Sequence, residues 1–203
     1  MLQTKQLIII GGPSCAGKTF LINKIQQRYY PHLREQLGLA VPHSWLYVNA
    51  KMLPNIREPI IKRLVVHYDF SNPSNTQRNR FNYLRELVSK SSSAIILTLC
   101  VPPKTLVRRM TLRLVKEYVS LLQKPKAYKK HTGHRRYFWK KRKMYKDGFS
   151  MFALYERWFN DINELSVASH WILDFSKSNI VMAHPYETDR IGIFTGVREV
   201  MDS

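Results

Sequence analysis

Hydrophobic segments of two kinds alternate along the chain. Short runs rich in β-branched and aromatic residues are typical of buried strands, whereas longer segments with apolar residues three or four positions apart are typical of helices. The predicted strands are residues 6–11, 44–48, 64–68, 93–101 and 170–175, and the predicted helices are 18–30, 54–63, 76–90, 104–122 and 149–166. This alternation predicts a three-layer α/β fold in which helices flank a mostly parallel sheet of about five strands.

The remaining segments carry turn and loop signals. Pro31, Gly38 and Pro42 predict a loop over residues 31–43, and the Ser-Asn-Pro-Ser-Asn run at 71–75 is typical of a turn. Residues after about 177 show no pattern that assigns them to an element. A length of 203 residues suits a single domain, residues 1–203.

A specific motif joins the first predicted strand to the first predicted helix. Residues 12–19 read GPSCAGKT, which is the G-x-x-x-x-G-K-[ST] pattern of the phosphate-binding P-loop. Glycines let such a loop curl so that its N–H groups point at phosphate oxygens, and the helix N-terminus that follows adds positive partial charge. We expect the motif to bind a nucleoside triphosphate through Gly12, Pro13, Ser14, Cys15, Ala16, Gly17, Lys18 and Thr19.

Charge changes this picture, because the chain is strongly basic. It has 33 lysines and arginines against 14 acidic residues, a net charge of +19 that favours an anionic partner. Residues 124–146 hold eleven of these cations, no acid and several interleaved aromatic residues. We interpret 124–148 as a basic insert within the domain. It is either a lid over a bound triphosphate, with Arg135 and Arg136 as candidate contacts, or a patch for nucleic acid or an anionic membrane surface.

Composition also limits the class of protein. A hydrophobic content of 44% is enough for a packed core, which excludes a disordered chain. The two cysteines, Cys15 and Cys100, have no spacing typical of a metal site or a disulfide framework, as expected of a protein in a reducing compartment. No apolar run is long enough for a leader or a transmembrane helix. We therefore expect a cytoplasmic protein, with peripheral attachment to a membrane surface left open.

Two further segments resemble the small P-loop kinases, a group that includes nucleoside monophosphate, gluconate and shikimate kinases. One is the strand-like run Val65–Phe70, in which Asp69 follows a hydrophobic stretch as an acid does in the nucleotide kinases. The other is Val101–Arg113, which resembles the family's strand, proline turn and lid helix with its Arg-x-x-x-Arg pair, here Arg109 and Arg113. Phe70-Ser71-Asn72 follows Asp69 where nucleotide kinases have Gly-Phe-Pro-Arg, so the acceptor is left open.

The motif and the resemblance together assign candidate roles. Lys18 is expected to neutralise charge on the transferred phosphoryl group, and Thr19 to hold Mg²⁺. Asp69 is expected to hold Mg²⁺ through water or to accept a proton from the acceptor, the alternative being a simple helix cap. Arg109 and Arg113 lie four residues apart and so share a helix face from which they can clamp phosphates.

We therefore predict an ATP- and Mg²⁺-dependent phosphotransferase that acts on an anionic metabolite, sugar or glycolipid. The sequence contains no Asn-Lys-x-Asp segment, which favours ATP over GTP without excluding GTP. Two alternatives stay open: a nucleic-acid enzyme such as a polynucleotide 5′-kinase, and a P-loop NTPase or interaction protein without a small acceptor. The sequence does not assign an oligomeric state.

Overall fold

The strands of the chain pair into one twisted sheet in the order β2-β3-β1-β4-β5-β6. The structure is a computed structural model that describes residues 3–39, 45–56, 60–71, 75–123, 128–165, 169–174 and 184–185. The strands are β1 (Gln3–Gly12), β2 (Leu46–Asn49), β3 (Ile60–Asp69), β4 (Ser91–Cys100), β5 (Ser169–Asp174) and β6 (His184–Pro185). The first five are parallel and β6 runs antiparallel to β5.

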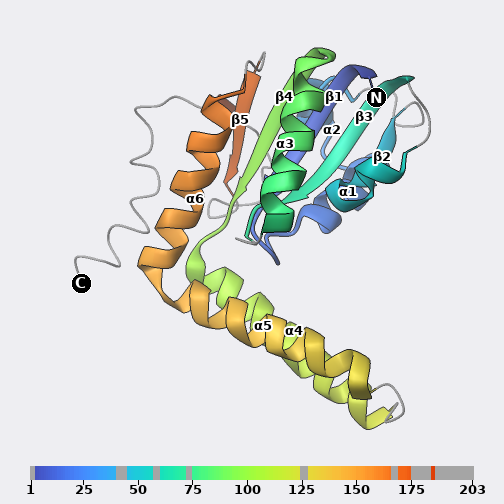
Figure 1. Cartoon of the computed structure of the whole chain (residues 1–203). Helices are drawn as coiled ribbons and strands as arrows, with labels where there is room; N and C mark the ends of the chain where they lie inside the picture. Colours follow the sequence, from blue (N-terminus) through green and yellow to red (C-terminus); the bar gives the residue numbers. More distant parts are fainter. Residues whose placement is uncertain are drawn as a thin grey trace.

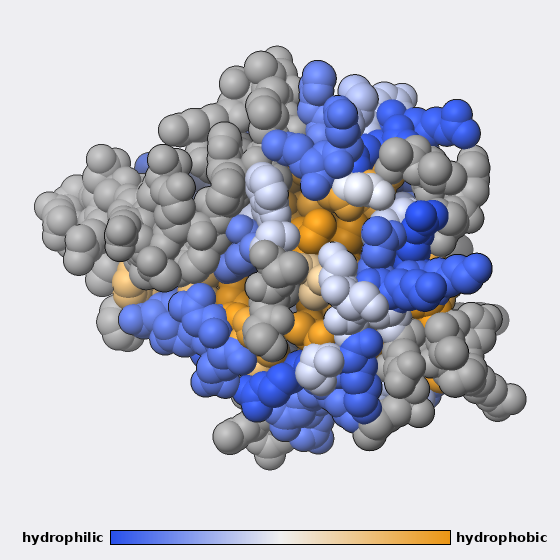
Figure 2. All heavy atoms as spheres, turned by 90° about the horizontal axis from the view of Figure 1, so that it is seen from above, coloured by the Kyte–Doolittle hydropathy of each residue, from blue (hydrophilic) through white to orange (hydrophobic). Residues whose placement is uncertain are grey.

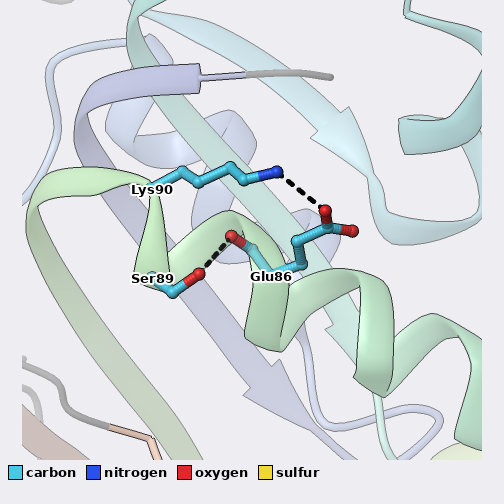
Figure 3. A network of polar contacts seen from close by, with 3 residues as sticks. All are labelled: Glu86, Ser89 and Lys90. Carbon is cyan, nitrogen blue, oxygen red and sulfur yellow. Dashed lines mark hydrogen bonds and ion pairs between the residues drawn. The ribbon is translucent and has the colours of Figure 1, made fainter.

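Helices cover both faces of this sheet. They are α1 (Lys18–Gln26), α2 (Pro31–Gln36), the short 3-10 helix η2 (Ala50–Asn55), α3 (Asn75–Ser89), α4 (Pro103–Gln123), α5 (Tyr128–Lys146) and α6 (Gly148–Asn163). α3 and α6 lie on one face, and α1 and α2 on the other (Figure 1). At the end of α3 the Ser89 hydroxyl donates to the Glu86 carbonyl and Lys90 pairs with the Glu86 carboxylate (Figure 3). The predicted α/β fold with about five parallel strands flanked by helices is confirmed.

The core is centred on β1 and on an aromatic stack that fastens α6 to the sheet. Trp158 is 1% exposed, stacks on Tyr68 and Phe70 of the β3 end, and donates its indole N–H to Thr98. Gly11 makes this close approach possible, because a Cβ there would lie 2.7 Å from the Trp158 ring. α6 therefore packs directly on the central strand.

Two local predictions are wrong. Residues 31–43 were expected to be a loop, but α2 begins at Pro31, whose fixed φ suits the first turn of a helix. Residues 54–63 were expected to be a helix, but η2 ends at Asn55 and β3 already begins at Ile60. The β-branched pair Ile60 and Ile61 extends the strand in place of that helix. Residues 72–74 and 124–127, and most of the chain after 174, lie outside the described residues.

α4 and α5 form a long antiparallel hairpin that extends from the carboxyl end of the sheet (Figure 1). Arg142 of α5 donates to the Thr111 hydroxyl at 2.9 Å, Arg135 contacts Tyr118, and Arg113 lies over the Phe138 ring. The described part of the basic segment is thus helix α5, packed along α4. None of the helices within the described ranges combines the length and hydrophobicity that a membrane span requires.

The opposite end of the sheet, where the strands begin, presents a different surface. Viewed from above, hydrophilic side chains surround a small central area in which hydrophobic side chains are visible (Figure 2). The candidate chemistry described below lies at the other end, because the carboxyl ends of parallel strands are where ligands bind in open α/β sheets.

The aromatic stack makes a testable contribution to stability. We expect Trp158→Ala to lower the free energy of unfolding by about 3–5 kcal/mol, because it removes a buried ring and leaves a cavity against Gly11. Trp139→Ala is the matched control, since that ring is 50% exposed, and it should change stability by less than about 1 kcal/mol. Urea unfolding measures both variants, and equal losses would contradict the proposed anchoring of α6.

Candidate functional site

The loop between β1 and α1 has a tightly curled backbone. Cys15 and Gly17 adopt positive φ angles of 67° and 101°, and the Ala16 amide donates to the Pro13 carbonyl. At Gly17 any side chain would be strained, and at Gly12 a Cβ would lie 3.1 Å from the Ala16 Cβ. Gly12 and Gly17 therefore permit a turn that other residues would disturb. α1 begins at Lys18, so the N-terminus of the helix faces this loop.

Lys18 is folded back across the loop. Its Nζ donates to the carbonyls of Gly12 and Pro13, both at 2.7 Å, and the residue is 4% exposed. Burial lowers the pKa of Lys18, and the nearby Asp69 carboxylate opposes that change. The ammonium group is therefore held at the loop by two carbonyl oxygens, where it can meet an anion.

Asp69 ends β3 directly beside Gly12, its partner in the parallel register of β1 and β3. Its Oδ2 accepts from the Ser14 hydroxyl at 2.6 Å, and its Oδ1 accepts from the Ser71 amide at 2.9 Å and the Ser71 hydroxyl at 2.7 Å. Burial alone would raise the pKa of Asp69, but Lys18 and these hydrogen bonds lower the pKa below its usual value. The carboxylate is thus ionised at neutral pH and tied to both the loop and the end of β3.

The two predicted arginines of α4 occupy different positions. The Arg109 guanidinium donates to the carbonyls of Cys15 at 3.2 Å and Ala16 at 2.8 Å, so it braces the loop from outside. Arg113, one turn further along α4, is exposed and lines the cavity next to the loop. The sequence assigned both arginines to one role, whereas the structure gives each of them different contacts.

A cavity of about 820 Å³ opens over the loop. Ligand pockets for molecules of drug size have volumes of about 300–1,000 Å³. Charged and polar residues of its lining include Lys18, Thr19, Asp69, Arg109 and Arg113. The complete lining is Ser14, Cys15, Ala16, Gly17, Lys18, Thr19, Phe20, Tyr30, His67, Asp69, Arg109, Leu112, Arg113 and Lys116. The structure therefore brings most of the predicted site residues to one cavity.

Sequence reasoning missed a stripe of side chains on α5. Tyr137, Lys141 and Tyr145 are four residues apart, so they share one helix face. The Tyr145 hydroxyl donates to the Ser14 carbonyl at 2.9 Å, and the Lys141 ammonium donates to the Ser71 carbonyl. Because Ser14 gives its only hydroxyl proton to Asp69, Tyr137 is the donor in its 2.6 Å bond to the Ser14 hydroxyl. The spacing of these residues was visible in the sequence, but their partners were not.

His67 lies on the same side of β3 as Asp69, two residues earlier, and lines the cavity. Asn49 accepts from the Lys51 amide through its side-chain oxygen, so its amide nitrogen is the donor to His67 Nδ1 at 2.8 Å. His67 therefore carries its proton on Nε2. Burial, together with the charges of Lys18 and Lys51, lowers the pKa of His67 to about 4. The structure makes it a neutral group at the cavity.

The remaining candidates lie at the edges of this arrangement. Arg135 contacts Tyr118 of α4, and neither Arg135 nor Arg136 is among the described residues that line the cavity. Burial raises the pKa of the Cys15 thiol, which does not favour a reactive thiolate. Within the described residues no group of three or more His, Cys, Asp or Glu side chains could hold a metal ion. A metal at this cavity would need oxygens from a ligand as well.

Comparison with known proteins gives no family. No protein-family model matches the chain, and no curated protein matches it. The resemblance to small P-loop kinases therefore stays a prediction, and function has to be inferred from the side chains around the cavity.

The buried histidines predict a specific pH dependence. Burial lowers the pKa values of both His67 and His170 to about 4. Unfolded histidines titrate near pH 6.5, so between pH 6.5 and about 4 the unfolded chain binds more protons than the folded chain. We therefore expect the free energy of unfolding to fall as the pH is lowered through this window, as measured by urea unfolding.

Substitutions separate this effect from general acid destabilisation. The double variant His67→Gln and His170→Gln should lose most of the slope between pH 6.5 and about 4. His32→Gln, at an exposed position, should keep the slope. NMR titration of the ring nitrogens reports the same groups directly, and a His67 ring that titrates near pH 6.5 would show that the site is more hydrated than described here.

Proposed function

We propose that the chain is a P-loop phosphotransferase that binds ATP, or GTP, with Mg²⁺ over residues Gly12–Thr19 and transfers the γ-phosphoryl group to an anionic acceptor. The observation that carries this proposal is the meeting of Lys18, Thr19, Asp69 and Arg113 at one cavity beside a curled glycine loop. These residues come from three separate elements, α1, β3 and α4. The cytoplasmic location predicted from the sequence belongs to the same proposal.

The loop suits a polyphosphate. Its curled backbone leads directly into the N-terminus of α1, and the positive end of a helix dipole favours anions. Lys18 now donates to two loop carbonyls, and phosphate oxygens would offer it stronger, charged acceptors. The lining adds Arg113 and Lys116, so cations lie on two sides of the cavity.

The donor set also fits a magnesium ion bound together with the triphosphate. Thr19 is an exposed hydroxyl residue at the start of α1, and Asp69 is an ionised carboxylate on the same cavity. Both oxygens of Asp69 already accept hydrogen bonds, which favours contact through water, and Mg²⁺ commonly keeps several waters. When bound, the ion would offset the negative charge that develops on the phosphate during transfer.

Individual side chains have different roles in the proposed phosphoryl transfer. Lys18 offsets negative charge on the phosphoryl group, and Arg113 is the exposed cation positioned to reach the same group. Arg109 acts indirectly, because its guanidinium holds the loop carbonyls of Cys15 and Ala16. In the reaction the bond from phosphorus to the bridging oxygen breaks and a bond to an acceptor oxygen forms.

The charge state of Asp69 limits the kinds of acceptor that the site can use. A carboxylate with a lowered pKa is a weak base, so it is poorly suited to removing a proton from a neutral hydroxyl. An acceptor whose attacking oxygen is already ionised, such as a phosphate ester, needs no such base. Phe20, Tyr30 and His67 also line the cavity, and the neutral His67 can donate a hydrogen bond to the acceptor from Nε2.

Transfer of labelled phosphate tests the proposal. The protein is incubated with ATP labelled on the γ-phosphate and with small metabolites, lipids and nucleic acids fractionated from a cell extract. We expect label in the metabolite or lipid fraction, and at least about 100-fold less with Lys18→Ala. Label in nucleic acid would instead support a polynucleotide kinase. Release of free phosphate with no labelled acceptor would overturn the phosphotransferase proposal and favour an NTPase.

Arg113 can be tested separately from the general basic charge of α4. We expect Arg113→Ala to lower kcat by about 100-fold, because it removes a cation that meets the transferred group. Arg108→Ala removes an exposed α4 cation that is not among the cavity lining residues, and it should keep activity close to that of the parent protein. Phosphate release or transfer kinetics measure both, and equal losses would point to long-range charge rather than contact.

A further inference from the structure

α4 carries a row of exposed aliphatic side chains along its outer side. Leu112, Val115, Val119 and Leu122 are 53%, 53%, 46% and 85% exposed. They are spaced three, four and three residues apart, so they form one continuous stripe of about three helical turns. Large aliphatic residues gathered on one face in this way mark an interaction surface more often than scattered exposed ones do.

This outer stripe lies away from α5. The inner side of α4 is formed by the buried residues Leu106, Met110 and Leu114, and α5 reaches α4 at Thr111, Arg113 and Tyr118. On a helical wheel the buried residues lie opposite the stripe, and the contacts with α5 lie on either side of that buried face. The α4–α5 packing therefore uses a different set of residues and leaves the stripe in solvent.

The hairpin that bears the stripe is also the source of the charge of the chain. Residues 103–146 contain sixteen lysines and arginines and one acid, Glu117, which gives fifteen of the nineteen net positive charges. Four of these cations, Lys104, Arg108, Arg113 and Lys116, are exposed on α4 itself. Lys104 lies three turns before Val115 on the same face, and Lys116 borders the stripe.

These observations select one kind of partner. A second copy of this chain would bring two hairpins of the same strong charge together, and a nucleic acid would leave the aliphatic stripe without a contact. A partner helix would be matched by charges in register along both edges of the stripe, whereas Lys116 borders one edge and the uncharged Thr111 borders the other. Aliphatic side chains combined with a diffuse positive field fit an anionic lipid surface.

We infer that α4 docks on an anionic membrane surface, with Leu112, Val115, Val119 and Leu122 entering the boundary between headgroups and acyl chains. The cations of the hairpin supply long-range attraction, and the stripe supplies the apolar contact that holds α4 along the surface. This surface differs from the basic segment 124–146 considered from the sequence, because its apolar part lies on the preceding helix.

Docking of this kind would bring the cavity to the lipid. Leu112 belongs to the stripe and also lines the cavity, as does Lys116. The mouth of the cavity would then open beside the headgroups, and the acceptor would be a phosphate oxygen carried by a lipid. This identification of the acceptor rests on the proposed phosphotransferase function, whereas docking itself does not.

Vesicle sedimentation tests the docking without nucleotide. The full chain is mixed with phosphatidylcholine vesicles, or with vesicles in which about one third of the lipid is phosphatidylglycerol. We expect binding to the anionic vesicles only. The triple variant Val115→Ser, Val119→Ser and Leu122→Ser should bind them at least about tenfold more weakly, because it loses buried aliphatic area and no charge. Serine and valine have similar helix propensities, and circular dichroism checks that the helices remain.

Matched controls show whether vesicle binding depends on the aliphatic stripe of α4 or on the positive charge alone. Met52→Ser removes an exposed apolar side chain, 48% accessible, on η2 outside the hairpin, and it should bind vesicles like the parent protein. Equal binding of the triple variant and the parent would overturn the docking, as would absence of binding to anionic vesicles or preference for an oligonucleotide competitor. Since no nucleotide is present, failure here leaves phosphoryl transfer to be judged by its own assay.

Discussion

The arrangement depends on one partly buried carboxylate at the point where two parallel strands end side by side. Asp69 accepts hydrogen bonds from Ser14 of the loop and from both donors of Ser71, and it lies close enough to Lys18 for their charges to interact. A buried charge is costly unless it is paired and hydrogen-bonded. Each of these contacts offsets that cost, and each also fixes a segment of the cavity wall.

α5 completes this arrangement from outside the sheet. Tyr145 donates to the Ser14 carbonyl and Lys141 donates to the Ser71 carbonyl. One face of α5 therefore connects the loop and the end of β3, the same two segments that Asp69 connects through its hydrogen bonds. Lys141 is only 4% exposed, and this burial lowers its pKa to about 8. α5 is rich in lysine and arginine, as an exposed basic surface would be, yet it also supports the loop through buried hydrogen bonds.

The sequence predicted what is encoded locally. Gly12–Thr19 form a contiguous motif whose spacing carries the chemistry, and the apolar runs predicted the parallel strands. Asp69 could be placed beside the loop because the carboxyl ends of parallel strands share an edge. The roles of Tyr137, Lys141 and Tyr145 depend on tertiary partners more than 60 residues away, and no local pattern records that pairing. α2 was not predicted because a proline such as Pro31 is common both in loops and at the first position of a helix.

α4 is one continuous helix whose two ends lie in different environments. Arg109 near its base holds the loop carbonyls, and Leu122 lies close to its tip. A helix of 21 residues is about 32 Å long, so a small change in tilt at the tip changes the position of Arg109 against the loop. Coupling of this kind is reciprocal. A partner that changes this tilt when it binds the outer part of α4 would therefore change the affinity of the loop for its ligand, and occupancy of the loop would change binding at the tip by the same factor.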